Sequence, residues 1–122
     1  MPRARLDSWT LLAVLLCGPK GGTLRDIIAA GDYANHAVFP FERLRDGLFA
    51  MRKTGLVSCE EDRYKASSRA RRFWRSARQK QRRVLKAWCL LERWLERLVP
   101  TPGASGIRKI TKKKYSAAVK DY

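Results

Sequence analysis

The stretch GLVSCEEDRYKASS, residues 55–68, decides which fold this chain can form. Its first residue is a glycine, and glycine suits the left-handed backbone that often ends a helix. Two short runs follow, at 56–59 and 63–66, on either side of three consecutive acids at 60–62. Such runs around a polar turn predict a two-stranded antiparallel hairpin with the acids at its tip.

Three helices are predicted upstream of the hairpin. The first spans about residues 9–17, where leucines recur at helical spacing, and the second follows the capping residue Thr23. The third begins at Pro40, which suits a first helical turn, and ends at Gly55. Three helices and a two-stranded hairpin make a mainly α domain over residues 1–66, with the plan of a winged helix-turn-helix.

The segment LRDGLFAMRKTGLVSCEEDRYKAS, residues 44–67, resembles the end of the recognition helix and the wing of MarR- and PadR-type winged-helix regulators. In that family a leucine-rich helix is followed by Gly-Leu-Val or Gly-Leu-Ile, a polar turn, Tyr-x-Leu-Thr and a further helix. The matching residues are Gly55, Leu56, Val57 and Tyr64. Ala66 and Ser67 stand where Leu-Thr is usual. The resemblance covers about residues 7–73 and implies a winged helix that binds DNA as a dimer.

A single long helix is predicted over residues 67–99, ended by Pro100. Apolar residues recur there at alternating steps of four and three, which favours lengthwise packing against another helix, and a second copy is the expected partner. The alternative is a helix that folds back on its own domain. The residues expected at the dimer seam are Trp74, Val84, Trp88, Leu91, Leu95 and Leu98. Residues 100–122, rich in Pro, Gly and Ser and then basic, predict a flexible basic tail.

Positive charge is concentrated in the second half of the chain. Twenty-seven Lys and Arg stand against eleven Asp and Glu, which gives a formal net charge of +16. Residues 1–66 carry a net charge of only +2, whereas residues 67–100 carry +9 and residues 101–122 carry +5. A charge of this size predicts a polyanionic partner.

Duplex DNA is the polyanion we expect, bound by a transcriptional regulator or a nucleoid-associated protein. The third helix would contact it through Arg43, Arg45, Arg52 and Lys53, and the hairpin through Arg63 and Lys65. The long helix and the basic tail would supply most of the affinity, the helix through Arg71, Arg72, Arg75, Arg78, Arg82 and Arg83. The acids at the hairpin tip would repel phosphates, so the tip is not expected to insert. The alternatives are a protein-binding winged helix, which the acidic tip favours, and an RNA-binding protein.

The sequence gives no catalytic constellation, and we expect a non-enzyme without cofactor or metal. His36 is the only histidine, and the three cysteines, Cys17, Cys59 and Cys89, are far apart. Reduced thiols of this kind are typical of a cytoplasmic protein. The apolar run at 11–17 resembles a leader peptide, but Leu16 precedes the cysteine where a small residue is wanted. The run is also too short to span a bilayer, so no membrane role is expected.

Overall fold

The computed structural model describes residues 6–98 and 109–121 of the 122-residue chain. Within this part the chain forms six helices and one two-stranded antiparallel sheet, which confirms the predicted mainly α fold. The elements are α1 (Ser8–Leu16), α2 (Leu24–Asn35), α3 (Phe41–Lys53), β1 (Val57–Glu60), β2 (Arg63–Ala66), α4 (Ser68–Lys80), α5 (Val84–Arg97) and α6 (Lys112–Asp121).

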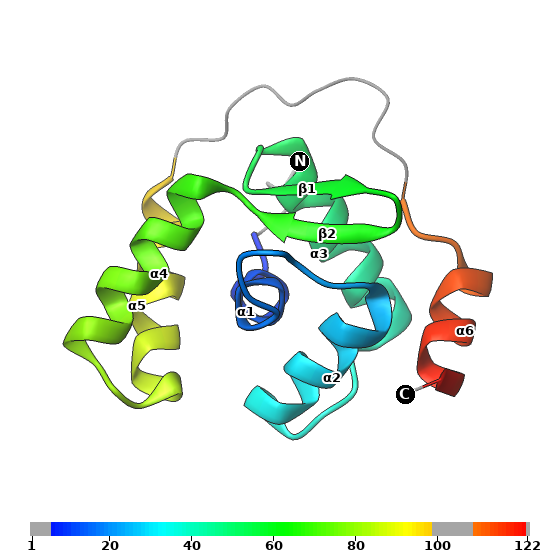
Figure 1. The fold of residues 1–122 in the computed structure, drawn as a ribbon, viewed down its shortest axis with the longest axis horizontal. Coiled ribbons are helices and arrows are strands. Elements are labelled where there is room, and N and C mark those ends of the chain that lie inside the picture. Colours follow the sequence, from blue (N-terminus) through cyan, green and yellow to red (C-terminus); the bar gives the residue numbers. More distant parts are fainter. Residues whose placement is uncertain (1–5, 99–108, 122) are drawn as a thin grey trace.

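Helix α1 lies at the centre of the fold. Figure 1 shows it nearly end-on, with the β-hairpin above it, α2 below it and the α4–α5 pair to its left. All its residues from Ser8 to Leu15 are buried, because a helix that is apolar on every side must be covered on every side. Its two buried polar side chains have partners: the Trp88 indole donates to the Ser8 Oγ (2.9 Å), and the Thr10 hydroxyl donates to the Asp7 carboxylate (3.0 Å).

Local signals fix α2 and α3. Thr23 and Asp26 form a reciprocal capping box at the start of α2, in which each side chain accepts from the other's backbone N–H. Helix α3 packs closely on α1 because residue 47 is glycine: a Cβ atom there would lie 2.2 Å from the Thr10 Oγ1. Gly55, at φ +79°, reverses the chain after α3, as predicted.

The hairpin pairs β1 with β2 in an antiparallel register that joins Val57 to Ala66 and Glu60 to Arg63. Its turn holds Glu61 and Asp62, both at positive φ, as a two-residue turn of this kind requires. A third short segment joins the sheet. The Gly22 N–H donates to the Tyr64 carbonyl (2.9 Å), and the Tyr64 N–H donates back to the Gly22 carbonyl (2.7 Å). The loop between α1 and α2 is thereby held against β2.

The prediction of one long helix over residues 67–99 is wrong. Helix α4 ends at Lys80, Gln81 adopts an extended backbone, and α5 runs back beside α4 (Figure 1). The physical reason is burial: folding back covers the apolar faces of both halves without a second chain. The Phe73 and Trp94 rings stack across the pair with their centroids 4.6 Å apart. The break falls at Gln81, the one polar residue in the series with steps of four and three, which runs through Ala70, Trp74, Ala77, Gln81, Val84 and Trp88.

The predicted dimer seam is corrected by the same packing. Leu91 is fully buried and Leu95 is 4% exposed, both in the core that α1 occupies, and Trp88 is bound to Ser8 of α1. These side chains are engaged within one chain, as in the fold-back alternative. Trp74, Val84 and Leu98 are partly buried against the same core. Homodimerisation itself stays a prediction.

The predicted flexible tail is wrong for residues 112–121, which form α6. Ile110 and Ala118 are buried, and the Tyr115 hydroxyl donates to the Phe39 carbonyl at 2.6 Å. These contacts hold α6 beside α2 at the right-hand end of the molecule in Figure 1. Residues 99–108 and 122, which the tail prediction also covered, lie outside the described residues.

Candidate nucleic-acid interface

Basic side chains cover the outward side of α4. The helix contains no acid, and its buried side is formed by Ala70 and Ala77. We call its basic residues the α4 basic face: Arg69, Arg71, Arg72, Arg75, Arg78 and Lys80. Arg71 and Arg78 are half-buried at one margin, and the other four are exposed. The sequence-predicted contacts Arg82 and Arg83 extend the face into the turn before α5, where both are exposed.

No arginine of the α4 basic face forms an ion pair within residues 6–98 and 109–121. Their polar contacts there are with neutral groups: Arg71 donates to the Ser68 hydroxyl, and Arg78 donates to the Arg82 carbonyl at 2.7 Å. The Arg71 Nε is buried without a hydrogen-bond partner in this part of the chain. Charge that is not neutralised nearby keeps a strong positive potential above the helix, which attracts phosphates.

Aromatic rings orient two of these guanidinium groups. Arg69 lies 5.6 Å from the Trp94 ring centroid, and Arg78 lies 6.0 Å from the Trp74 ring centroid. Cation–π contacts of this kind restrict side chains that would otherwise be mobile. By contrast, the exposed residues of α5 alternate in sign, with Glu92 and Glu96 among Arg93 and Arg97. Within the α4–α5 pair, the unmixed positive surface is therefore confined to α4 and the turn.

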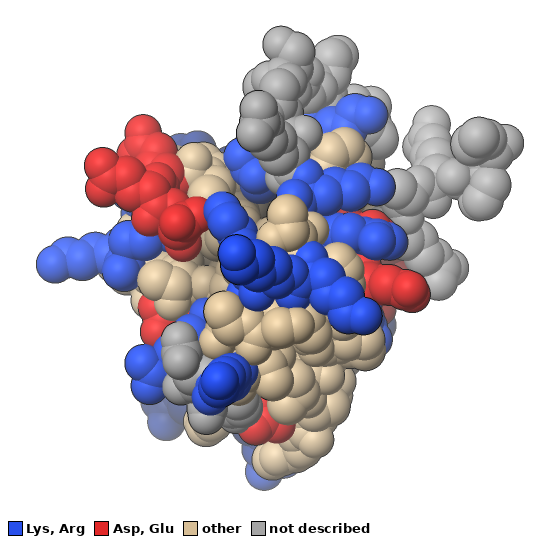
Figure 2. All heavy atoms as spheres, turned by 90° about the vertical axis from the view of Figure 1, so that its right-hand side faces the viewer, with Lys and Arg blue, Asp and Glu red and all other residues tan. Residues whose placement is uncertain are grey.

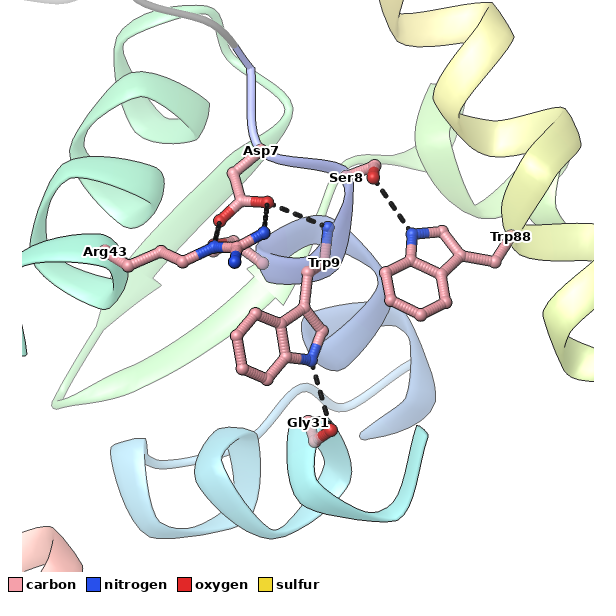
Figure 3. A network of polar contacts seen from close by, with 7 residues as sticks. Asp7, Ser8, Trp9, Gly31, Arg43 and Trp88 are labelled. Carbon is pink, nitrogen blue, oxygen red and sulfur yellow. Dashed lines mark hydrogen bonds and ion pairs between the residues drawn. The ribbon is translucent and has the colours of Figure 1, made fainter. Parts of the chain in front are cut away.

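Arg43, predicted to contact DNA, is held by contacts within the fold (Figure 3). Its guanidinium makes two bonds to the Asp7 carboxylate, of 2.9 Å and 3.2 Å, and lies 4.6 Å from the Trp9 ring centroid. The hydrogen bond to Asp7 raises the pKa of Arg43. Asp7 also caps α1 by accepting from the Trp9 N–H, and the Trp9 indole donates to the Gly31 carbonyl. Arg43 thus links the start of α1 to α3.

The other sequence-predicted contacts of α3 and the hairpin differ in their exposure and in their partners. The Arg45 Nε lies 2.8 Å from an oxygen of Asp46, and this hydrogen bond lowers the pKa of Asp46. Lys53 is exposed at the end of α3 beside the Phe49 ring, whereas Arg52 is half-buried. In the hairpin, Arg63 donates to the Gly21 carbonyl at 3.2 Å and Lys65 is exposed.

The C-terminal segment covers part of α3 and the hairpin tip. The Lys109 ammonium lies 5.0 Å from the Phe49 ring centroid and 4.0 Å from an oxygen of Asp46. The Lys114 ammonium lies 3.1 Å from an oxygen of Asp62 at the tip. The sequence analysis did not predict that the tail packs against the rest of the chain. The signal was the apolar spacing of Ile110, Tyr115, Ala118 and Val119 among the lysines.

Other chemistry has little support among the described residues. No group of three His, Cys, Asp or Glu side chains there is placed to hold a metal ion. All three cysteines are free, and burial raises the pKa of Cys17 to about 11, so that its thiol stays protonated near neutral pH. None of the described helices combines the length and the apolar character needed to cross a bilayer.

Comparison of the chain with protein-family models, with curated proteins and with solved structures finds no match.

Proposed function

We propose that this protein binds duplex DNA through the α4 basic face. The observation that carries the proposal is the run of six basic side chains on the outward side of one helix, with no carboxylate paired to its arginines in the described part of the chain. Phosphates that contact such a face release condensed counterions, which is the main source of sequence-independent affinity. A cytoplasmic transcriptional regulator or nucleoid-associated protein is the class this proposal favours.

We further propose that residues 6–66 are a winged helix-turn-helix. The order of elements supports this assignment: a helix, a short segment paired to β2 at Gly22, two helices and a hairpin. In this proposal α4 makes the main DNA contact, as expected for the long helix, and α3 is no longer assigned a direct contact. Arg43 and Arg45 of α3 are paired with carboxylates, and Lys109 lies over Phe49 on the outer side of that helix.

The shape of the α4 basic face favours DNA over RNA. Basic residues flank an outward centre formed by Arg72, Arg75 and Gln79, which are all exposed. A helix with this pattern can enter the major groove of B-DNA, where phosphates line both walls. The major groove of an A-form RNA duplex is too narrow for a helix. We therefore expect unlabelled duplex RNA to compete poorly with duplex DNA for the protein.

A pair of matched double variants tests the proposal. In one, Arg72 and Arg75 of α4 are replaced by Gln; in the other, the exposed Arg93 and Arg97 of α5 are replaced by Gln, with the same loss of charge. Fluorescence anisotropy of a labelled DNA duplex should show binding weakened about tenfold or more by the α4 changes, because two phosphate contacts are lost. The α5 changes should have little effect. Equal weakening by both variants would show that only total charge matters and would contradict the proposal.

A second candidate function has one observation in its favour. The surface formed by α3 and the hairpin tip already contacts a basic segment of the same chain, since Asp46 and Asp62 pair with Lys109 and Lys114. That surface could serve a winged helix that binds proteins. A pull-down after nuclease treatment separates the two functions, because a protein partner is retained and a partner bridged by nucleic acid is lost.

A further inference from the structure

Helix α6 carries a second basic surface. Its inward side packs through Tyr115 and Ala118, so that Lys112, Lys113 and Lys120 are exposed to solvent. We call these three lysines the α6 basic face. Figure 2 views the molecule from this side and shows basic side chains spread across it, with a group of acidic side chains at the upper left edge.

The C-terminal segment brings lysines to acids of α3 and of the hairpin tip. Asp46 of α3 and Asp62 of the hairpin tip are both exposed on this side, and an unpaired acid repels phosphates. Lys109 and Lys114 pair with these two acids. The three lysines of the α6 basic face remain unengaged by any ion pair among the described residues and face outward.

The α4 and α6 basic faces lie at opposite ends of the molecule. Figure 1, in which the longest axis is horizontal, places α4 at the left end and α6 at the right end, with α1, α2 and α3 between them. Each helix turns its buried side toward the core, Ala70 and Ala77 in α4 and Ala118 in α6. The two basic faces therefore point away from each other. A straight duplex cannot follow both, because DNA is stiff over about 150 base pairs.

We propose that a single protomer binds two duplex segments at once, one on the α4 basic face and one on the α6 basic face, and so bridges DNA. This inference rests on the proposed function, since α4 must hold the first duplex. The α6 basic face has three lysines against the six basic residues of α4, so its contact is weaker and shorter. Bridging should therefore be lost at a lower salt concentration than binding.

A two-duplex capture assay tests the inference with the full chain. One DNA duplex is fixed to beads, protein is bound to it, and capture of a second, fluorescent duplex is measured. In the test variant Lys112, Lys113 and Lys120 are each replaced by Gln. In the control Lys20, Arg93 and Arg97, which are also exposed, are each replaced by Gln, so both variants lose three positive charges.

We expect the test variant to bind the first duplex as well as the control does and to capture at least about tenfold less of the second, since its phosphate contacts are gone. Capture that is equal in the test variant and the control would overturn the inference and would indicate bridging by self-association. Binding of the first duplex by wild-type protein without capture of the second would also overturn it and would leave the proposed function intact. If wild-type protein does not bind the first duplex, both the proposed function and this inference are contradicted.

Discussion

Arg43 and Arg72 show how the surroundings of an arginine decide its role. Both were sequence-predicted DNA contacts, and both lie on helices that carry other basic residues. Arg43 is held by the carboxylate of Asp7, 36 positions earlier in the chain, and by the Trp9 ring. Arg72 is exposed and has no ion pair among the described residues. A sequence pattern on one helix gives no information about a partner so distant in the chain.

Replacing Arg43 by Ala should therefore lower stability and leave duplex binding nearly unchanged. The bidentate ion pair and the cation–π contact together are worth about 1 kcal/mol on a partly exposed site, which is a few degrees in melting temperature. Thermal unfolding and fluorescence anisotropy measure the two effects. Arg25→Ala, a change at an exposed residue of α2, is the control. If the Arg43→Ala variant keeps its stability but binds DNA more weakly, Arg43 is a DNA contact and this prediction is contradicted.

At the scale of helices and strands, the sequence predicted what local signals determine. The cap at Thr23, Gly55 at the end of α3, and the two runs around the acidic turn were each predicted, because each depends on residues close in the chain. The break at Gln81 and the docking of α6 were missed. Both depend on distant contacts: Phe73 on Trp94, and Tyr115 on the Phe39 carbonyl.

Because α5 folds back on α4, we expect Leu91 to stabilise the core of one chain and not a contact between two chains. Leu91→Ala should lower the free energy of unfolding by about 2–5 kcal/mol, because a fully buried leucine leaves a cavity when it is shortened. Leu85→Ala is the control, since that side chain is 62% exposed on the same helix. Urea unfolding measures both, and sedimentation measures association. A Leu91→Ala variant that keeps its stability but changes its association state would support the original seam.

At the scale of the whole molecule, the charge lies mainly at the two ends of the longest axis. Composition alone predicted a polyanionic partner, because a net charge of +16 needs no structure to be counted. Composition could not place that charge. The α4 basic face at one end and the α6 basic face at the other follow from the fold, in which α1 takes the centre and α4 and α6 turn their basic sides outward (Figure 1).

The salt dependence of duplex binding tests the role of α4 most directly. The logarithm of the binding constant falls linearly with the logarithm of salt concentration, with a slope of about 0.9 for each phosphate neutralised. Replacing Arg72 and Arg75 by Gln should reduce this slope by about 2, whereas replacing Arg93 and Arg97 should leave it near the wild-type value. Slopes that are the same for wild type and both variants would contradict the assignment of phosphate contacts to the α4 basic face.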